Sequence, residues 1–267
     1  MEKKVLEKVM ETAQKAGQAA LSFYDQEYEI KDKGGNSPVT QADLESNRII
    51  LDSLAEYDYG VLSEETEDDR KRLARNRVWI IDPLDGTKDF IHKTGEFSIM
   101  IGLAEKIGGI FEPIMGVVYL PAQDLFYYSF RGEGAFKREG TKKEQQIKVS
   151  SRNKFGGFRL VGSRFHSSET EEDLNQKLNF ERKIPCGSVG VKVCLLAEGK
   201  AELNLNPSDK TWEWDICAPD AILREAGGTL TDLEGNHFSY NKKDPRNSRG
   251  YIASNGLRHN KILKEIK

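Results

Sequence analysis

The sequence WIIDPLDGTKDF, at residues 79–90, decides how the rest of the chain is interpreted. The β-branched and aromatic residues at 78–81 predict a buried strand. Because Pro83 cannot donate a hydrogen bond to a β ladder, we expect that strand to end at Asp82. Gly86 then permits a backbone conformation that other residues resist, so the chain is expected to turn there.

Two carboxylates, Asp82 and Asp85, leave this strand end three positions apart. Carboxylate and freed carbonyl oxygens suit Mg²⁺, which shares its coordination shell with substrate phosphate. The backbone amides of Gly86 and Thr87 could hold a phosphate group if a helix or an anion-binding nest begins there. The simpler interpretation is an Asp-Pro turn followed by an Asp-Gly turn, since both dipeptides are ordinary turn signals.

The hexapeptide DPLDGT after a hydrophobic strand resembles the signature of the lithium-sensitive, Mg²⁺-dependent phosphatases. These include inositol monophosphatase, fructose-1,6-bisphosphatase and 3′(2′),5′-bisphosphate nucleotidase. The resemblance covers residues 5–255 and implies alternating layers of helices and sheets, α-β-α-β-α. Independently, an antiparallel first half and helix-covered sheets in the second half predict a layered α+β fold.

Length and composition restrict the class of protein. The chain has 267 residues, of which 37% are hydrophobic, so it can form one large domain or two intimately packed ones. Net charge is −3, which argues against binding to nucleic-acid polymers. No apolar run approaches the roughly 20 residues of a membrane span, and the charged N-terminus lacks the apolar core of a secretion signal.

The three cysteines are Cys186, Cys194 and Cys217, an odd number without metal-ligand spacing. We interpret them as small buried apolar residues in a reducing compartment, and we expect a cytoplasmic protein. The basic, polar stretch at 137–154 is the candidate boundary between two halves. Residues 1–137 would carry the metal site and residues 138–267 the substrate-binding elements, packed closely enough to count as one domain.

Hydrophobic periodicity predicts the remaining elements. The expected helices lie at 3–24, 41–56, 169–178, 188–199, 214–226 and 257–267. The expected strands lie at 59–63, 97–104, 114–120, 125–130, 159–162, 201–205, 229–232 and 250–254. The polar residues at 66–76 are expected to form a solvated loop or a frayed helix.

A phosphatase that uses two or three metal ions needs more acids than one strand end supplies. Glu64 follows the short strand at 59–63, where the phosphatase family has a Glu, although the acidic run at 64–69 could simply be solvated. Asp215 begins a helix in the sequence WDICAP, where it can cap the helix, ligate a metal, or do both. This segment and Gly227-Gly228 resemble the family's second signature, in the form found in the nucleotidase branch.

Thr40 and Asp43 match a Thr-x-x-Asp element of the family, and a helix-capping box explains them equally well. No Cys or His has a spacing that suggests a covalent phosphoenzyme, so a metal-activated water is the expected nucleophile. The resemblance implies that Glu64 orients this water and that Thr87, hydrogen-bonded to Asp43, aligns it or accepts its proton. It also implies two or three Mg²⁺ ions. The implied metal ligands are Glu64, Asp82, the carbonyl of Leu84, Asp85 and Asp215.

The substrate contacts are expected in the second half of the chain. Ser163, Arg164 and His166 lie in GSRFH, which resembles a nucleotide-contacting element of the nucleotidases, although His166 could be a surface loop residue. Ser188 begins a helix that suits a second phosphate, and Lys192 adds a positive charge there. The full predicted substrate-binding set is Asp85, Gly86, Thr87, Ser163, Arg164, His166, Ser188, Lys192 and Asp215.

The leading functional hypothesis is hydrolysis of 3′-phosphoadenosine 5′-phosphate to AMP and phosphate. An inositol or sugar phosphatase is the alternative within enzymes, but a neutral polyol would need no residue for a second phosphate, so Arg164, His166 and Lys192 favour the nucleotide. A non-catalytic nucleotide-binding relative would lack some of the acids, and none of the expected acids is missing. The expected partner is a small phosphorylated molecule, and the family often forms homodimers.

Overall fold

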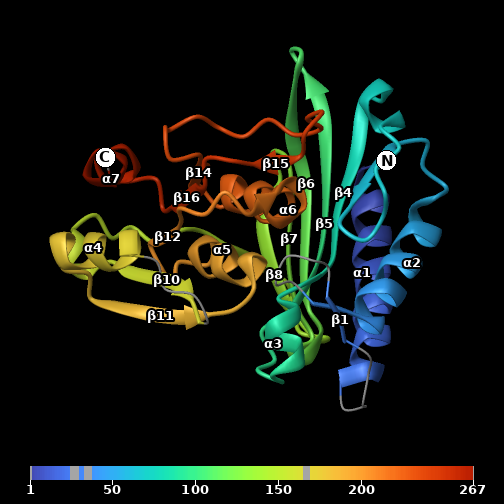
Figure 1. Ribbon diagram of the computed structural model, residues 1–267, viewed down its shortest axis with the longest axis horizontal. Helices are drawn as coiled ribbons and strands as arrows, with labels where there is room; N and C mark the ends of the chain where they lie inside the picture. Colours follow the sequence, from blue (N-terminus) through green and yellow to red (C-terminus); the bar gives the residue numbers. More distant parts are fainter. Residues whose placement is uncertain (1, 25–29, 33–37, 165–168, 267) are drawn as a thin grey trace.

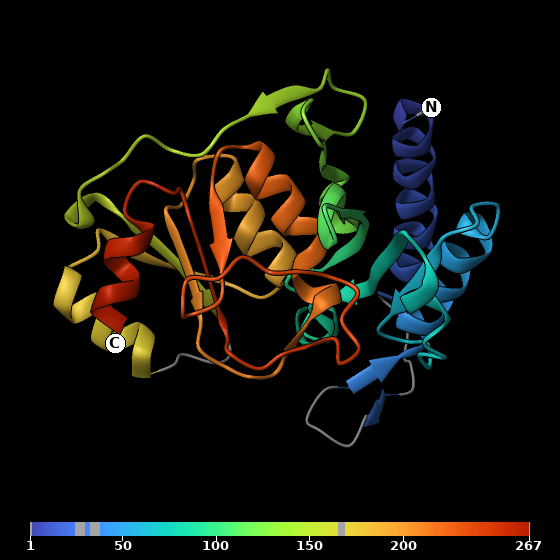
Figure 2. The ribbon, with the colours of Figure 1, turned by 90° about the horizontal axis from the view of Figure 1, so that it is seen from above.

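The computed structural model describes residues 2–24, 30–32, 38–164 and 169–266. Figure 1 shows five layers: α1 and α2, a seven-stranded sheet, α5 and α6, a five-stranded sheet, and finally α4 and α7. The same order is seen from above (Figure 2). The predicted α-β-α-β-α arrangement is therefore confirmed. The layer helices are α1 (Glu2–Tyr24), α2 (Gln41–Leu54), α4 (Glu169–Leu178), α5 (Val189–Ala197), α6 (Glu213–Glu225) and α7 (His259–Ile266).

The larger sheet has the order β3-β4-β5-β6-β7-β8-β9. Only β3 and β4 are parallel, and all the other neighbours are antiparallel. The sequence predicted this antiparallel meander for β5, β6 and β7. The strands are β3 (Gly60–Ser63), β4 (Arg77–Asp85), β5 (Ser98–Ile107), β6 (Ile110–Leu120), β7 (Leu125–Phe130), β8 (Gly134–Glu139) and β9 (Gln145–Ile147). The polar sequence suggested a loop over most of β8 and β9, but pairing at the sheet edge satisfies their backbone groups.

The smaller sheet has the order β11-β10-β12-β16-β14, with β10 parallel to both of its neighbours. Its strands are β10 (Arg159–Ser163), β11 (Arg182–Cys186), β12 (Leu203–Asn206), β14 (Thr229–Thr231) and β16 (Tyr251–Ser254). The sequence predicted all of these except β11. Pro185 obscures that strand in the sequence, and β11 can accommodate it because the strand lies at the sheet edge.

Short elements complete the fold. Two small antiparallel pairs join β1 (Ile30–Asp32) to β2 (Pro38–Thr40) and β13 (Thr211–Trp212) to β15 (Arg246–Asn247). One helical turn, α3 (Thr87–Ile91), follows the central strand β4, and a 3₁₀ turn, η1 (Lys71–Ala74), precedes it. Among the described helices, none is long and apolar enough to cross a membrane.

The prediction that the central strand ends at Asp82 is wrong. β4 continues through Pro83 to Asp85, but its register with β5 shifts between Asp82 and Asp85. Pro83 lies inside that irregularity, where the ladder does not need its missing amide hydrogen. Because of this irregularity, Asp82 and Asp85 do not follow the regular alternation of side chains between the two faces of the sheet, although both lie at the end of one strand.

Two glycines bring α6 unusually close to the larger sheet. A Cβ atom at Gly116 would lie 2.1 Å from the carbonyl oxygen of Ala218, and a Cβ at Gly102 would lie 2.7 Å from Sγ of Cys217. Neither sheet position could therefore carry a side chain while α6 stays in place. This close packing fixes the N-terminal end of α6, which carries Asp215. All three cysteines are buried and free, as predicted.

The prediction that 66–76 is a solvated loop or a frayed helix is wrong about solvation at one position. Arg72 is only 2% exposed. Its guanidinium donates to the Asp68 carboxylate, to Oδ1 of Asn241 at 2.6 Å and to the carbonyl of Lys242 at 2.9 Å. These partners offset the cost of burying the charge, and two of them lie too far along the chain for the sequence to indicate them.

One buried histidine predicts how stability depends on pH. His259 is held between the hydroxyls of Thr231 and Ser254, with 2.8 Å contacts at both ring nitrogens. Burial lowers its pKa to about 4, so the folded protein holds the neutral ring. The unfolded chain, with a pKa near 6.5, binds more protons between these two values, so stability is lost as pH falls from about 6.5 to 4. The loss from this group is at most about 3 kcal/mol.

The variant His259→Asn should be less stable near pH 8 but should lose less stability on acidification. Urea unfolding of both proteins between pH 8 and pH 4 measures the difference. If the unfolding free energies of the two proteins fell by the same amount between pH 8 and pH 4, this account of His259 would be contradicted.

Candidate active site

The acids of the first half meet where β3 ends at Ser63 and β4 continues past it to Asp85. The two strands are parallel, and Ser63 pairs with Ile81. Glu64 follows Ser63, and its amide donates to the carbonyl of Ile81 at 3.2 Å. The carboxyl ends of neighbouring parallel strands lie at the same edge of a sheet, so Glu64 and Asp82 leave it together.

Asp82 is the electrostatic centre of this group. It is 2% exposed, and its Oδ1 accepts one hydrogen bond from the amide of Leu84 at 3.0 Å. Burial raises the pKa of Asp82 well above its usual range, and the charges of Glu64, Asp85 and Asp215 raise it further. The structure thus brings four of the predicted acids close enough to interact, from three separate segments of the chain.

Asp85 connects the central strand to α5. Its Oδ2 accepts from the hydroxyl of Ser188 and from the amide of Gly190 at 2.8 Å. Burial raises the pKa of Asp85 to about 6, while these two hydrogen bonds and the charge of Lys192 act in the opposite direction. Ser188 is also the N-cap of α5, as predicted, since its Oγ accepts from the amide of Val191.

Thr87 lies at the start of α3, directly after Gly86. Gly86 has φ of 90°, in the left-handed region where a Cβ is strained. The hydroxyl of Thr87 lies 3.3 Å from Oδ1 of Asp43 and 3.4 Å from the carbonyl of Leu84. Asp43 is 1% exposed and Thr87 is half-buried, so the carboxylate is shielded from bulk water while the hydroxyl is partly accessible. The predicted proximity of Thr87 and Asp43 is present.

Asp215 lies in the first turn of α6. Its Oδ2 accepts from the amide of Trp212 at 2.6 Å. Asp215 therefore caps α6 from the third helical position, and Trp212, not Asp215, is the N-cap residue. The same carboxylate raises the pKa of Asp82. Its capping hydrogen bond and its proximity to the other acids therefore coexist.

The predicted substrate residues divide into two groups. Lys192 is 7% exposed, and within the described residues its ammonium forms no hydrogen bond or ion pair, although its charge lowers the pKa of Asp85 and Asp89. Arg164, in contrast, donates to Glu96 at 2.6 Å and lies 3.4 Å from Asp89. His166 and the side chain of Thr40 lie outside the described residues. Ser163 is half-buried at the end of β10.

Sequence reasoning missed two kinds of residue near this site. Asp89 and Glu96 hold Arg164, and both are close to DPLDGT in sequence, so their acidity beside the motif was an available signal. Tyr251 is 1% exposed on β16, and its pKa is raised by burial and then by Asp215 and Asp85. No local pattern indicates Tyr251, because its position depends on the pairing of distant strands.

The donor atoms of the group are carboxylate and carbonyl oxygens, which fit a hard divalent cation such as Mg²⁺. As the side chains lie, no three His, Cys, Asp or Glu residues in the described ranges are grouped to hold an ion. Three carboxylate oxygens already have partners: Oδ1 of Asp82 accepts from Leu84, Oδ2 of Asp85 from Ser188 and Oδ2 of Asp215 from Trp212. The chemistry of the donors thus fits Mg²⁺, but their present arrangement is not a coordination sphere.

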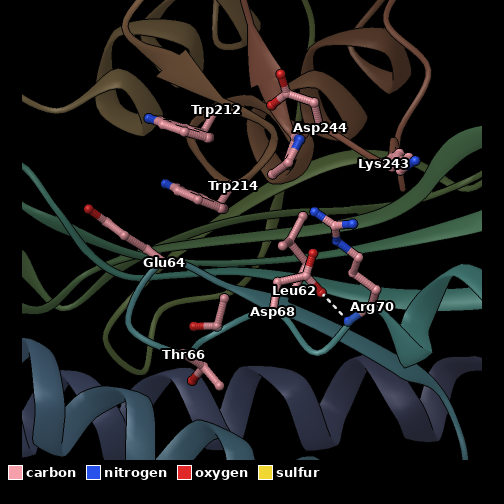
Figure 3. Close-up of a pocket in the computed structure, with 11 residues that line it drawn as sticks. Leu62, Glu64, Thr66, Asp68, Arg70, Trp212, Trp214, Lys243 and Asp244 are labelled. Atoms are coloured by element: carbon pink, nitrogen blue, oxygen red, sulfur yellow. Dashed lines mark hydrogen bonds between the residues drawn. The ribbon is translucent and has the colours of Figure 1, made fainter.

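A cavity of about 600 Å³ adjoins the acids on the β3 side. Glu64 lies at one end, and Trp212 and Trp214 form part of the wall (Figure 3). Asp82, Asp85 and Lys192 do not line it. The cavity is therefore a neighbour of the acid group.

Comparison with known proteins decides the family. A model of the inositol monophosphatase family matches residues 1–267. The chain belongs to this family. It is 33% identical over 258 residues to the 3′(2′),5′-bisphosphate nucleotidase CysQ of Escherichia coli K12, covering 94% of this chain and 99% of that protein. It is 36% identical over 248 residues to the Salmonella typhimurium CysQ, with 90% and 95% covered.

A solved structure supports the same family assignment. CysQ from Bacteroides thetaiotaomicron, a bacterial member of the inositol monophosphatase family, matches with a TM-score of 0.80 and 32% identity, over 96% of this chain and 98% of its own. The family resemblance inferred from DPLDGT and the Trp-Asp helix is thus confirmed. Phosphatases of the inositol monophosphatase family are generally metal-dependent.

The double role of Ser188 generates a prediction for the site. Ser188→Ala removes the N-cap of α5 and leaves Oδ2 of Asp85 with only the Gly190 amide. We expect a loss of about 1 kcal/mol in unfolding free energy, the usual cost of removing a cap. Urea unfolding measures it.

Ser98→Ala is the matched control, because Ser98 contacts the Ser188 hydroxyl at 3.0 Å but is not hydrogen-bonded to Asp85. Its effect should be smaller. A Ser188→Ala protein as stable as the wild type would contradict the capping role.

Proposed function

We propose that this protein hydrolyses the 3′-phosphate of 3′-phosphoadenosine 5′-phosphate, giving AMP and phosphate, with two or three Mg²⁺ ions in the site. The observation that carries the proposal is the convergence of Glu64, Asp85 and Asp215 on the buried Asp82. Four carboxylates in one place are unfavourable without a cation. The names of the nucleotidase relatives support the choice of substrate.

The proposed ligands are all close to the end of β4. Bound Mg²⁺ would lower the pKa of a coordinated water and offset charge on the phosphoryl oxygens. The residues proposed to hold it are Glu64, Asp82, the Leu84 carbonyl, Asp85 and Asp215. Glu64, which directly follows the strand paired with β4, would also orient the attacking water.

The chain's own residues would bind the phosphate and guide the proton. The amides of Gly86 and Thr87 begin a helical turn and would donate to the phosphate that is cleaved. The Thr87 hydroxyl, within 3.3 Å of Asp43, would align the water, and the buried Asp43 carboxylate would receive the proton passed through it. The weak contact leaves the hydroxyl able to exchange partners when substrate binds.

The second phosphate of the substrate would bind at the start of α5. Ser188 and Lys192 lie one helical turn apart, and Lys192 is a largely buried cation without an ionic partner in the described ranges. A buried ammonium in that state is stabilised by an anionic ligand. Ser163, Arg164 and His166 are proposed to contact the nucleoside, which requires Arg164 to exchange at least one of its acidic partners.

Three further properties stay predictions. We infer a homodimer, a cytoplasmic location and two packed halves, 1–137 and 138–267. In the structure the larger sheet continues to Ile147, and α5 and α6 lie between the two sheets, so the halves share a core.

The activity is tested by phosphate release from 3′-phosphoadenosine 5′-phosphate, inositol 1-phosphate and fructose 1,6-bisphosphate, with Mg²⁺ or EDTA. We expect the nucleotide to be the preferred substrate and EDTA to abolish turnover. Asp85→Asn should lower the rate at least about a hundredfold, since metal charge stabilisation contributes several kcal/mol. Full activity in EDTA would refute the metal requirement, and preference for inositol 1-phosphate would make the inositol phosphatase the better assignment.

The binding role of Lys192 gives a second test of the same proposal. Lys192→Ala should lower kcat/KM for the bisphosphorylated nucleotide about tenfold or more, roughly the loss of one charge-assisted contact. Inositol 1-phosphate has no second phosphate, so its slow hydrolysis should hardly change. Equal losses on both substrates would show that Lys192 supports the fold or the metal site instead.

A further inference from the structure

The cavity beside Glu64 has walls from three distant parts of the chain. The loop after β3 contributes Asp68 and Arg70, β13 and α6 contribute Trp212 and Trp214, and the loop before β15 contributes Lys243. Its volume of about 600 Å³ falls in the range of small-molecule sites. It shares Glu64 with the acid group but none of the other proposed metal ligands.

Two stacked indoles form one wall. The rings of Trp212 and Trp214 are nearly parallel, with centroids 5.1 Å apart and an interplanar angle of 6°. Both residues are half-buried, and Figure 3 shows their nitrogen-bearing edges turned toward the Glu64 end of the cavity. A pair of half-buried indoles can stack a further planar ring.

Two cations lie toward the other end of the cavity. In Figure 3, Arg70 and Lys243 lie on the side away from Glu64, and the carboxylate of Asp244 also lines that end. Within the described ranges, neither side chain forms a hydrogen bond or an ion pair, because the nearby Asp68 carboxylate is occupied by Arg72. These two charges are available to an anionic group on a ligand.

A buried hydrogen-bond network links the opposing walls of the cavity. The guanidinium of Arg72 joins Asp68, on one wall, to Asn241 and Lys242, which lead into the other. Glu213, 0% exposed, accepts from the amides of Asn241 and Lys242 at 2.6 and 2.8 Å. The cavity therefore has fixed walls, which lowers the entropic cost of binding a ligand.

We propose that this cavity is a second binding site, for a planar aromatic anion of the size of a purine mononucleotide. The ring would stack on the indole pair, and the phosphate would bind Arg70 and Lys243. This site goes beyond the proposed function, because the proposed reaction places both substrate phosphates at Gly86 and Lys192, and neither residue lines this cavity.

AMP is the probe, titrated in EDTA and followed by quenching of tryptophan fluorescence. The parent protein for the test is Lys192→Ala, which weakens any binding of AMP at the reaction site. In that background AMP should still quench the fluorescence. Adding Arg70→Asn and Lys243→Ala should raise the Kd about tenfold or more, the scale expected for two charge-assisted contacts. Asn is chosen at position 70 because Arg70 has φ of 62°, a conformation that Asn tolerates.

Trp212→Ala should weaken AMP binding to a similar extent, measured by calorimetry since a fluorophore is lost. Lys106→Ala is the matched control: it removes an exposed charge outside the cavity and should leave the Kd unchanged. Thermal unfolding checks that each variant is folded.

Loss of AMP binding in Lys192→Ala alone would overturn the second site, and so would binding that survives removal of both cations. Neither result bears on hydrolysis, which the substrate panel measures separately. If the protein hydrolyses none of the substrates in the panel but binds AMP through Arg70 and Lys243, the second site is supported and the proposed reaction is refuted.

Discussion

Repulsion among buried carboxylates is the constraint on which this structure depends. Asp82 is almost fully buried and is surrounded by the charges of Glu64, Asp85 and Asp215. Asp82 and Asp85 are buried and Glu64 and Asp215 are half-buried, and such a group of carboxylates destabilises a fold unless a cation or a proton compensates. The raised pKa of Asp82 and the value of about 6 for Asp85 express this cost in the absence of an ion.

The fold holds these acids together by close packing elsewhere. Gly102 and Gly116 let α6 lie directly on the larger sheet, which brings Asp215 to the end of β4. Ser188 holds α5 and Asp85 together, so a second helix is fixed to the same strand. Both helices lie between the two sheets, so the central layer of the molecule supports the site.

The surroundings of the acid group are asymmetric. On one side, Lys192 is buried without an ionic partner in the described ranges, and Arg164 is held by Asp89 and Glu96. On the other side, a cavity with stacked indoles is framed by the buried Arg72 and Glu213. The acid group thus adjoins two different surfaces, one that carries Lys192 and Arg164 and one formed by the cavity.

The sequence by itself determined the layered fold, most helices and strands, the family and the candidate acids. These depend on local patterns: β-branched residues before DPLDGT, helical periodicity, and caps such as Ser188. Only the tertiary structure decided that β4 continues past Pro83, that Arg72 is buried, and that Arg164 is held by acids. Each of those outcomes depends on contacts with residues on other elements, such as β5 for the strand and Asn241 for Arg72. Polar residues have the same local pattern whether they face water or a distant partner, so the sequence cannot separate the two.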